Sequence, residues 1–177
     1  NKSLTAGAGG AILSNKAKFA KIFKHLIDNS KTNKPYYHLD FGFNYKISNL
    51  HSSILLGQLK RYKEIKNKKN KIKTFYNREL KSNKFKLIKS DNTIWQNFIV
   101  LDNKVNKSNL IKNAIKKKIM LKDFWVPMRD QKLLKKEMIF SKKLKSNSFL
   151  KRILPIPSSS FLTKKDLKRV VNFLNFY

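Results

Sequence analysis

The sequence has no cysteine among its 177 residues, which excludes a disulfide framework, a thiolate nucleophile and a cysteine metal site. Proline and glycine are also scarce, with four and five residues, so few positions are marked as turns. No uninterrupted run of 18 apolar residues occurs, and the first residues lack the basic, apolar and small-residue order of a secretory signal. We therefore expect a cytoplasmic protein without membrane insertion.

Acidic residues are the other shortage, because 10 Asp and Glu stand against 41 Lys and Arg and give a net charge of +31. Such a charge favours binding to nucleic acid and other polyanions. Only five of the basic residues are arginine, however, and the planar guanidinium is the group best suited to reading bases and gripping phosphates. The lysine excess therefore indicates a biased genome, without specific nucleic-acid binding. A basic nucleic-acid-binding module remains the alternative function.

The apolar content of 41% is enough for a core. Three of the five glycines lie in residues 7–10, directly before the apolar run 11–13, which predicts a turn that leads into a strand. Asn15 is expected to cap a helix that ends near Asn29. An extended segment should follow over residues 39–45, where apolar side chains alternate.

Ser48 is the expected N-cap of a long helix that reaches Leu80, because apolar residues recur at helical spacing between them. The middle of this helix, KNKKNK at 66–71, is polar throughout. It marks either a solvent-exposed part of one helix or a break between two.

The pattern changes to strands after Ser82, over residues 85–88 and 95–101. Ser108 opens a helix, and residues 119–125 are expected to be extended. Thr163 and Asp166 have the spacing of a capping box at the start of a last helix. The stripe that this helix is expected to bury consists of Leu167, Val170, Val171 and Leu174.

These elements predict an α/β protein in three parts. Residues 1–48 would be the end of an incomplete large domain, residues 49–83 a long connecting helix, and residues 84–177 a small α+β domain. The large-domain part has only one expected strand, which would leave a sheet edge uncovered, and the first residue is Asn rather than Met. We therefore expect an N-terminal half to precede Asn1.

Four ordered segments resemble the DegT/DnrJ/EryC1/StrS aminotransferases. Residues 1–13, NKSLTAGAGGAIL, resemble the Schiff-base segment of the family, and residues 42–50, GFNYKISNL, resemble its Gly-Tyr-Asn-Tyr-Arg-Met-Ser-Asn segment. Residues 124–128, FWVPM, and 154–159, LPIPSS, are similar to a Trp-x-Pro segment and a Leu-Pro-Ser-Ser stretch of members that act in surface-sugar synthesis. The resemblance covers essentially the whole chain.

The resemblance implies the C-terminal half of a fold-type-I aminotransferase that uses pyridoxal 5'-phosphate. Its activity would be the transfer of an amino group from an amino acid, usually glutamate, to a nucleotide-linked keto sugar for lipopolysaccharide or another surface polysaccharide. The family also implies a homodimer in the full-length protein. Without its N-terminal half, the fragment is expected to be inactive.

The same resemblance assigns the site residues. Lys2 would be the Schiff-base lysine, and Asn44 would reach the cofactor phosphate across a dimer interface. Tyr45, Lys46, Trp125 and Arg129 would contact the nucleotide sugar. Lys46 stands where the family usually has Arg and Arg129 where related sequences often have His, so the fit at these two positions is weaker.

Other chemistries lack the residues they need. His38 and Asp40 lie on one side of the expected extended segment, but two ligands do not make a metal site. A Ser-His-Asp arrangement has no nucleophile elbow to anchor it. We therefore expect no metal ion and no serine-hydrolase activity.

Overall fold

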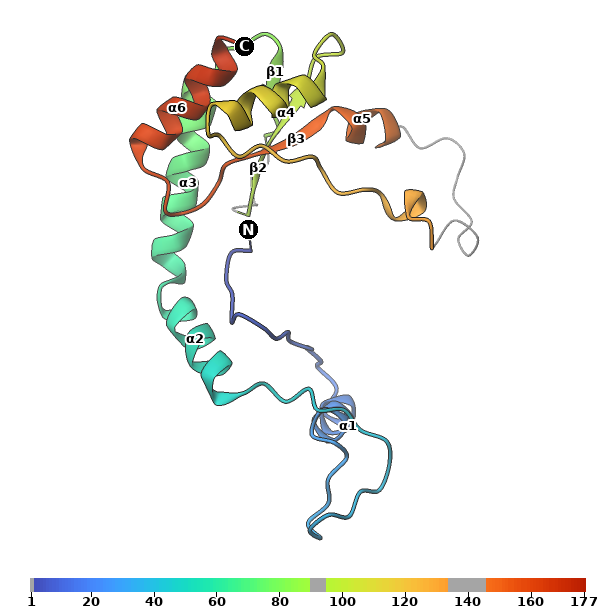
Figure 1. The fold of residues 1–177 in the computed structure, drawn as a ribbon. Coiled ribbons are helices and arrows are strands. Elements are labelled where there is room, and N and C mark those ends of the chain that lie inside the picture. The colour runs from blue at the N-terminus through green and yellow to red at the C-terminus, as the bar shows by residue number, and fades with distance from the viewer. Residues whose placement is uncertain (1, 90–94, 134–145) are drawn as a thin grey trace. The chain divides into compact units, whose positions relative to one another are not determined.

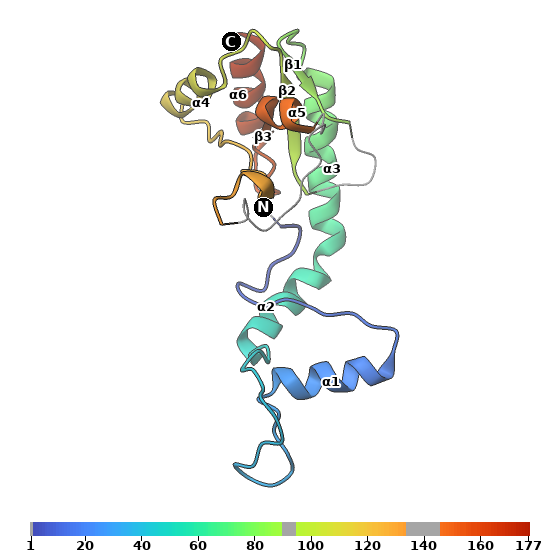
Figure 2. The same ribbon diagram turned by 90° about the vertical axis from the view of Figure 1, so that its right-hand side faces the viewer.

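The computed structural model describes residues 2–89, 95–133 and 146–177. The chain divides into two compact units, which we call the N-terminal unit (Lys2–Lys63) and the C-terminal unit (Glu64–Tyr177). The N-terminal unit contains helices α1 (Ala17–Ile27) and α2 (Asn49–Lys60), whereas the sheet and the other helices belong to the C-terminal unit (Figures 1 and 2).

The C-terminal unit is built on three antiparallel strands in the order β1-β2-β3. They are β1 (Phe85–Leu87), β2 (Asn97–Leu101) and β3 (Ile153–Ile156). The register places Phe85 opposite Leu101 and Ile99 opposite Leu154. The helices and the short 3-10 turn η1 of this unit are α3 (Tyr62–Glu79), α4 (Lys107–Lys116), η1 (Met128–Asp130), α5 (Ser146–Arg152) and α6 (Lys164–Asn175).

Strand β3 was not expected from the sequence, because Pro155 lies within it. Proline has no N–H for a ladder hydrogen bond, so it is tolerated only at the edge of a sheet. Strand β3 is such an edge, since it pairs with β2 alone and sets Pro155 opposite Phe98. The two expected strands, by contrast, are present as β1 and β2 within the predicted ranges.

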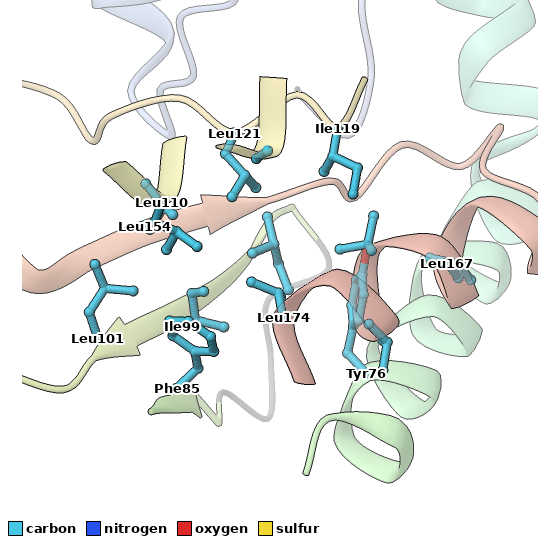
Figure 3. Close-up of a cluster of buried hydrophobic side chains, with 14 of the residues drawn as sticks. Tyr76, Phe85, Ile99, Leu101, Leu110, Ile119, Leu121, Leu154, Leu167 and Leu174 are labelled. Carbon is cyan, nitrogen blue, oxygen red and sulfur yellow. The ribbon is translucent and has the colours of Figure 1, made fainter. Parts of the chain in front are cut away.

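One apolar core holds the C-terminal unit together. Strand β2 buries Ile99 and Leu101 at alternate positions, as a half-buried strand requires. Helices α3, α4 and α6 cover the strands, and Figure 3 shows their side chains converging on β2 and β3. The core residues from the helices include Ile72, Tyr76, Leu110, Ala114, Leu167, Val170, Val171 and Leu174.

Helix α6 confirms two predictions. Thr163 and Asp166 form a reciprocal capping box, with the Thr163 side chain accepting from the Asp166 backbone N–H. The expected stripe from Leu167 to Leu174 is buried. Its C-terminal end is joined to α3, because the Asn175 side chain donates to the Glu79 carbonyl at 2.9 Å. The ends of α3 and α6 therefore lie side by side (Figure 1).

The long helix expected between Ser48 and Leu80 is two helices. Ser48 caps α2 as predicted, by accepting from the His51 backbone N–H at 3.3 Å, but α2 ends at Lys60 and α3 begins at Tyr62. The polar stretch 66–71 is not the break. It lies inside α3 and is exposed except at Lys69.

The strand expected over residues 11–13 is wrong, because these residues form no regular secondary structure. A strand exists only where a neighbour accepts its hydrogen bonds, and no described segment of the N-terminal unit pairs with it. The extended segment 39–45 is likewise reduced to one isolated bridge, between Asn44 and Asp28, and a second isolated bridge joins Lys31 to His38 just before it. Residues 119–125 also run without regular structure.

The N-terminal unit has no apolar core among its described residues. Ser30 is its only buried residue, whereas every buried apolar side chain of the described chain belongs to the C-terminal unit. Large apolar side chains are instead exposed in the N-terminal unit, and Leu13, Tyr36 and Phe41 are more than nine-tenths exposed. Across the described ranges, none of the helices has the length and apolarity needed to traverse a lipid bilayer.

Candidate active site

The glycine turn after Lys2, residues 5–10, is shaped by two backbone conformations that favour glycine. Gly7 and Gly9 have φ angles of +82° and +125°. Thr5 supports the turn, because its hydroxyl accepts from the Gly7 N–H at 3.0 Å. The positive φ angles explain why glycine occupies positions 7 and 9, and the hydrogen bond explains the hydroxyl side chain at position 5.

The glycine turn packs against the start of α2. A Cβ added to Gly7 would meet the His51 ring at 3.4 Å, and one added to Gly9 would meet Ile47 at 3.3 Å. The His51 ring is itself held by Ser48, whose hydroxyl lies 2.8 Å from its Nδ1. Two sequence motifs that are more than 30 residues apart therefore form one local structure.

The segment that carries Asn44, Tyr45 and Lys46 is fixed to the end of α1. The Phe43 N–H donates to the Leu26 carbonyl at 2.7 Å, and the Tyr45 N–H donates to the Ile27 carbonyl at 3.0 Å. The Asn29 N–H donates back to the Phe43 carbonyl at 3.1 Å. The backbone of this segment is therefore placed by hydrogen bonds rather than by apolar burial.

Gly42 permits this close approach. A Cβ at this position would lie 2.3 Å from backbone atoms of both Asn29 and Ser30, which is far inside van der Waals contact. Ser30 is fully buried here, and its hydroxyl donates to the Phe41 carbonyl at 2.9 Å. The glycine of the second motif is thus required by packing.

The side chains of this segment point outward. Asn44 is exposed, and Tyr45 is exposed while stacking on Phe43 with ring centroids 5.0 Å apart. Lys46 places its Nζ 2.9 Å from Asp28 Oδ2, and this hydrogen bond holds the pKa of Asp28 below its usual value. The segment therefore offers an amide, a phenol and a paired ammonium to a ligand.

Lys2 is exposed and lies in a stretch without regular secondary structure. A lysine that reacts with an aldehyde must be deprotonated, which burial or a neighbouring cation favours. The described residues of the N-terminal unit do not provide that burial. They do fit a phosphate-bearing aldehyde in part, since they supply the amine, the glycine turn and an exposed amide at Asn44.

The C-terminal unit contains a cavity of about 420 Å³ that we call the aromatic cavity. Its main feature is Trp125 stacked on Trp95, with ring centroids 5.2 Å apart and planes 7° from parallel. Phe124 contacts Trp125 with centroids 4.8 Å apart. The remaining lining residues are Gln96, Phe98, Met120, Lys122, Asp123, Pro155, Ile156, Pro157 and Ser158.

Ser158 organises the wall of the aromatic cavity. Its hydroxyl donates to the Ile156 carbonyl at 2.8 Å and accepts from the Asn97 backbone N–H at 2.9 Å. The Asn97 side chain donates to the same hydroxyl at 3.0 Å. The residues that follow β3 are thereby joined to the start of β2.

The structure thus groups some predicted site residues. Asn44, Tyr45 and Lys46 share one anchored segment, and Trp125 lines the aromatic cavity. Arg129 belongs to η1, but its side chain lies outside the described part of the structure. Sequence reasoning missed Trp95 and Ser158 as site residues. The scarcity of tryptophan could have pointed to Trp95, because the chain has only two tryptophans and Trp125 was already a candidate.

Comparison with known proteins agrees with the resemblance seen in the motifs. The model of the DegT/DnrJ/EryC1/StrS aminotransferase family matches residues 1–175. The chain is 25% identical over 185 residues to EpsN of Bacillus subtilis (strain 168), which is provisionally named a pyridoxal phosphate-dependent aminotransferase. This match covers 98% of the chain and 47% of EpsN.

Solved structures show the same fold. The Helicobacter pylori aminotransferase PseC, involved in the biosynthesis of pseudoaminic acid, matches with a TM-score of 0.87 at 18% identity, over 98% of this chain and 49% of PseC. The sugar aminotransferase CalS13 of Micromonospora echinospora matches with a TM-score of 0.82 at 14% identity, over 98% of this chain and 49% of CalS13. The chain thus spans about half the length of these relatives.

The fold is that of part of a fold-type-I aminotransferase, in which the C-terminal unit supplies an α+β layer. The match of the family model extends over nearly every residue, including the glycine turn, the segment after Gly42 and the aromatic cavity. The chain therefore belongs to the DegT/DnrJ/EryC1/StrS aminotransferase family.

Proposed function

We propose that the protein containing this chain transfers an amino group from an amino acid, glutamate, to a keto sugar attached to a nucleotide diphosphate. Family membership supports the reaction class. The observation that carries the proposal is the packing of the glycine turn after Lys2 against Ile47 and His51. This packing brings the Lys2 motif and the Asn44 motif together in each subunit, so that in a two-fold dimer Asn44 of one subunit can face the cofactor held by Lys2 of the other.

Lys2 is the proposed catalytic residue. Pyridoxal 5'-phosphate, when bound, stores the electrons released at the substrate carbon. The Lys2 amine holds the cofactor covalently in the resting protein, and after release it moves a proton at the substrate carbon. The Asn44 amide would donate a hydrogen bond to the cofactor phosphate, from one subunit of a homodimer to the other.

The nucleotide sugar is assigned to Tyr45, Lys46, Trp125 and Arg129. Lys46 already pairs with Asp28 at 2.9 Å, so a diphosphate would compete with that carboxylate for the ammonium. Trp125 stacks one face on Trp95 and remains 58% exposed, which leaves apolar surface for a sugar ring. CalS13 is a sugar aminotransferase by name, and this supports a sugar as substrate.

We place the protein in the cytoplasm, in the synthesis of a surface polysaccharide such as lipopolysaccharide. The parts 1–48, 49–83 and 84–177 are proposed as the end of the cofactor-binding domain, the connecting segment with helices α2 and α3, and the small domain. The exposed apolar side chains of the N-terminal unit would be covered by the rest of the cofactor-binding domain. We therefore expect the 177-residue chain alone to bind the cofactor weakly.

The test is replacement of Lys2 in a protein of the relatives' full length. Lys2→Ala should abolish glutamate-dependent amino transfer. It should also prevent borohydride from attaching the cofactor, detected by its absorbance, to the peptide that carries residue 2. Lys18→Ala is the matched control, because Lys18 is an exposed lysine on α1 and should leave both signals intact. Turnover that survives in Lys2→Ala would remove Lys2 from the mechanism.

A further inference from the structure

Lys69 is the one lysine of the described chain that is buried. It lies on α3 and is only 7% exposed, on the same face as the core residues Ile72 and Tyr76. Burial lowers its pKa below the usual lysine value. No carboxylate among the described residues pairs with it, so its placement is not explained by an ion pair.

The Lys69 ammonium joins two distant segments of the chain. It donates to the Trp95 carbonyl at 2.8 Å and to the Ser158 carbonyl at 3.1 Å. Trp95 lies two residues before β2, and Ser158 lies two residues after β3. About two helical turns farther along α3, the Tyr76 hydroxyl donates to the Pro157 carbonyl at 2.7 Å. Helix α3 therefore holds both segments from one side.

All three acceptor residues line the aromatic cavity. The backbone of Trp95 determines where its indole lies, and Trp125 stacks on that indole with planes 7° from parallel. The Ser158 hydroxyl is committed to Asn97 and Ile156, so the wall has little freedom once Lys69 holds it. The position of the stacked pair thus depends on donors that lie outside the cavity.

We propose that Lys69 is a positioning residue, whose ammonium fixes the wall of the aromatic cavity so that Trp95 and Trp125 present a rigid stacked surface to the sugar of a nucleotide sugar. The identity of this ligand rests on the proposed function, whereas the positioning itself does not. Lysine suits the role because it has three donors and no acceptor. Methionine would fill the same space and leave both carbonyls without their donor.

The stacked pair gives a direct measurement, because the 177-residue chain contains no other tryptophan. Near-ultraviolet circular dichroism of the chain reports the two indoles, and far-ultraviolet circular dichroism reports its helices. In Lys69→Met we expect loss of the tryptophan signal with the helical signal retained, and in Lys69→Arg a partial recovery. Lys68→Met is the matched control, because Lys68 is an exposed neighbour on α3 that pairs with Glu64.

Tyr76→Phe is a second route to the same wall, since it removes only the hydroxyl bound to Pro157. It should weaken the tryptophan signal even if Lys69→Met were to lose its helices. An unchanged tryptophan signal in a folded Lys69→Met would overturn the positioning role, and so would an equal change in Lys68→Met.

Ligand binding is measured separately, by quenching of tryptophan fluorescence with UDP-N-acetylglucosamine as probe. We expect Lys69→Met to bind this probe about tenfold more weakly than the unmodified chain, because a displaced binding surface loses contact geometry. If the unmodified chain fails to bind the probe while the dichroism changes as expected, the proposed sugar site falls and the positioning role stands. Equal probe affinity in Lys69→Met and the unmodified chain would overturn the link between the two.

Discussion

Replacing Gly42 with alanine should release the segment that carries Asn44 and Lys46 from the end of α1. The new Cβ would lie 2.3 Å from the carbonyl carbon of Asn29 and 2.3 Å from the nitrogen of Ser30, whereas ordinary contact begins at 3.4 Å. Both atoms belong to the backbone, so no rotamer change relieves the overlap. The segment around Gly42 must therefore move away from Asn29 and Ser30 by about 1 Å.

That separation breaks the hydrogen bonds that place the segment. Three of them, from Phe43 N–H to Leu26, from Asn29 N–H to Phe43 and from the Ser30 hydroxyl to Phe41, span 2.7, 3.1 and 2.9 Å. Each contributes about 1 kcal/mol, so the local cost is roughly 3 kcal/mol. Hydrogen exchange of the Phe43 amide should then accelerate roughly 150-fold.

Gly57→Ala is the matched control for this experiment. Gly57 lies inside α2, and a Cβ there meets nothing within 4 Å. The same chemical change should stabilise the helix by about 1 kcal/mol and leave the Phe43 amide protected. Equal protection of that amide in the Gly42 and Gly57 variants would refute the packing argument.

Two further predictions concern the C-terminal unit. Thr163→Ala removes the hydroxyl that accepts from the Asp166 N–H at 3.2 Å and should lower the free energy of unfolding by about 1 kcal/mol, measured by urea denaturation; an unchanged midpoint would contradict the role of the cap. Burial lowers the pKa of Lys69, so between its folded pKa and 10.5 the unfolded chain binds more protons and the free energy of unfolding rises with pH. Lys69→Met should lose this increment, and parallel pH profiles of the two proteins would argue against it.

The sequence predicts those elements of the fold that are specified locally. Ser48 and the pair Thr163 and Asp166 cap helices because the needed groups are three residues apart, and β2 alternates because one face is buried. Residues 11–13 fail as a strand because a strand depends on a partner that no local pattern reveals. Strand β3 was missed because Pro155 is permitted only by its position at the sheet edge.

The residues of the candidate site also differ in whether a local sequence pattern predicts them. The motif around Gly42 could be found by resemblance, and its geometry then gave the reason for the glycine. The wall of the aromatic cavity could not be predicted, because its contacts join residues that are distant in the sequence. Trp95 is 26 residues from Lys69, and Ser158 is 89 residues from it. A lysine inside the run KNKKNK has no local feature that distinguishes it from its exposed neighbours.

The N-terminal unit, which has Ser30 as its only buried residue, has a thermodynamic consequence for the protein. A unit whose apolar side chains are exposed gains little free energy of folding from its own interior, so a surface that covers them stabilises the segment bearing Lys2 and Asn44. If a partner surface supplies that cover, association and the ordering of this segment are linked equilibria. Dilution would then destabilise the N-terminal unit before it unfolds the C-terminal unit, which has a core of its own.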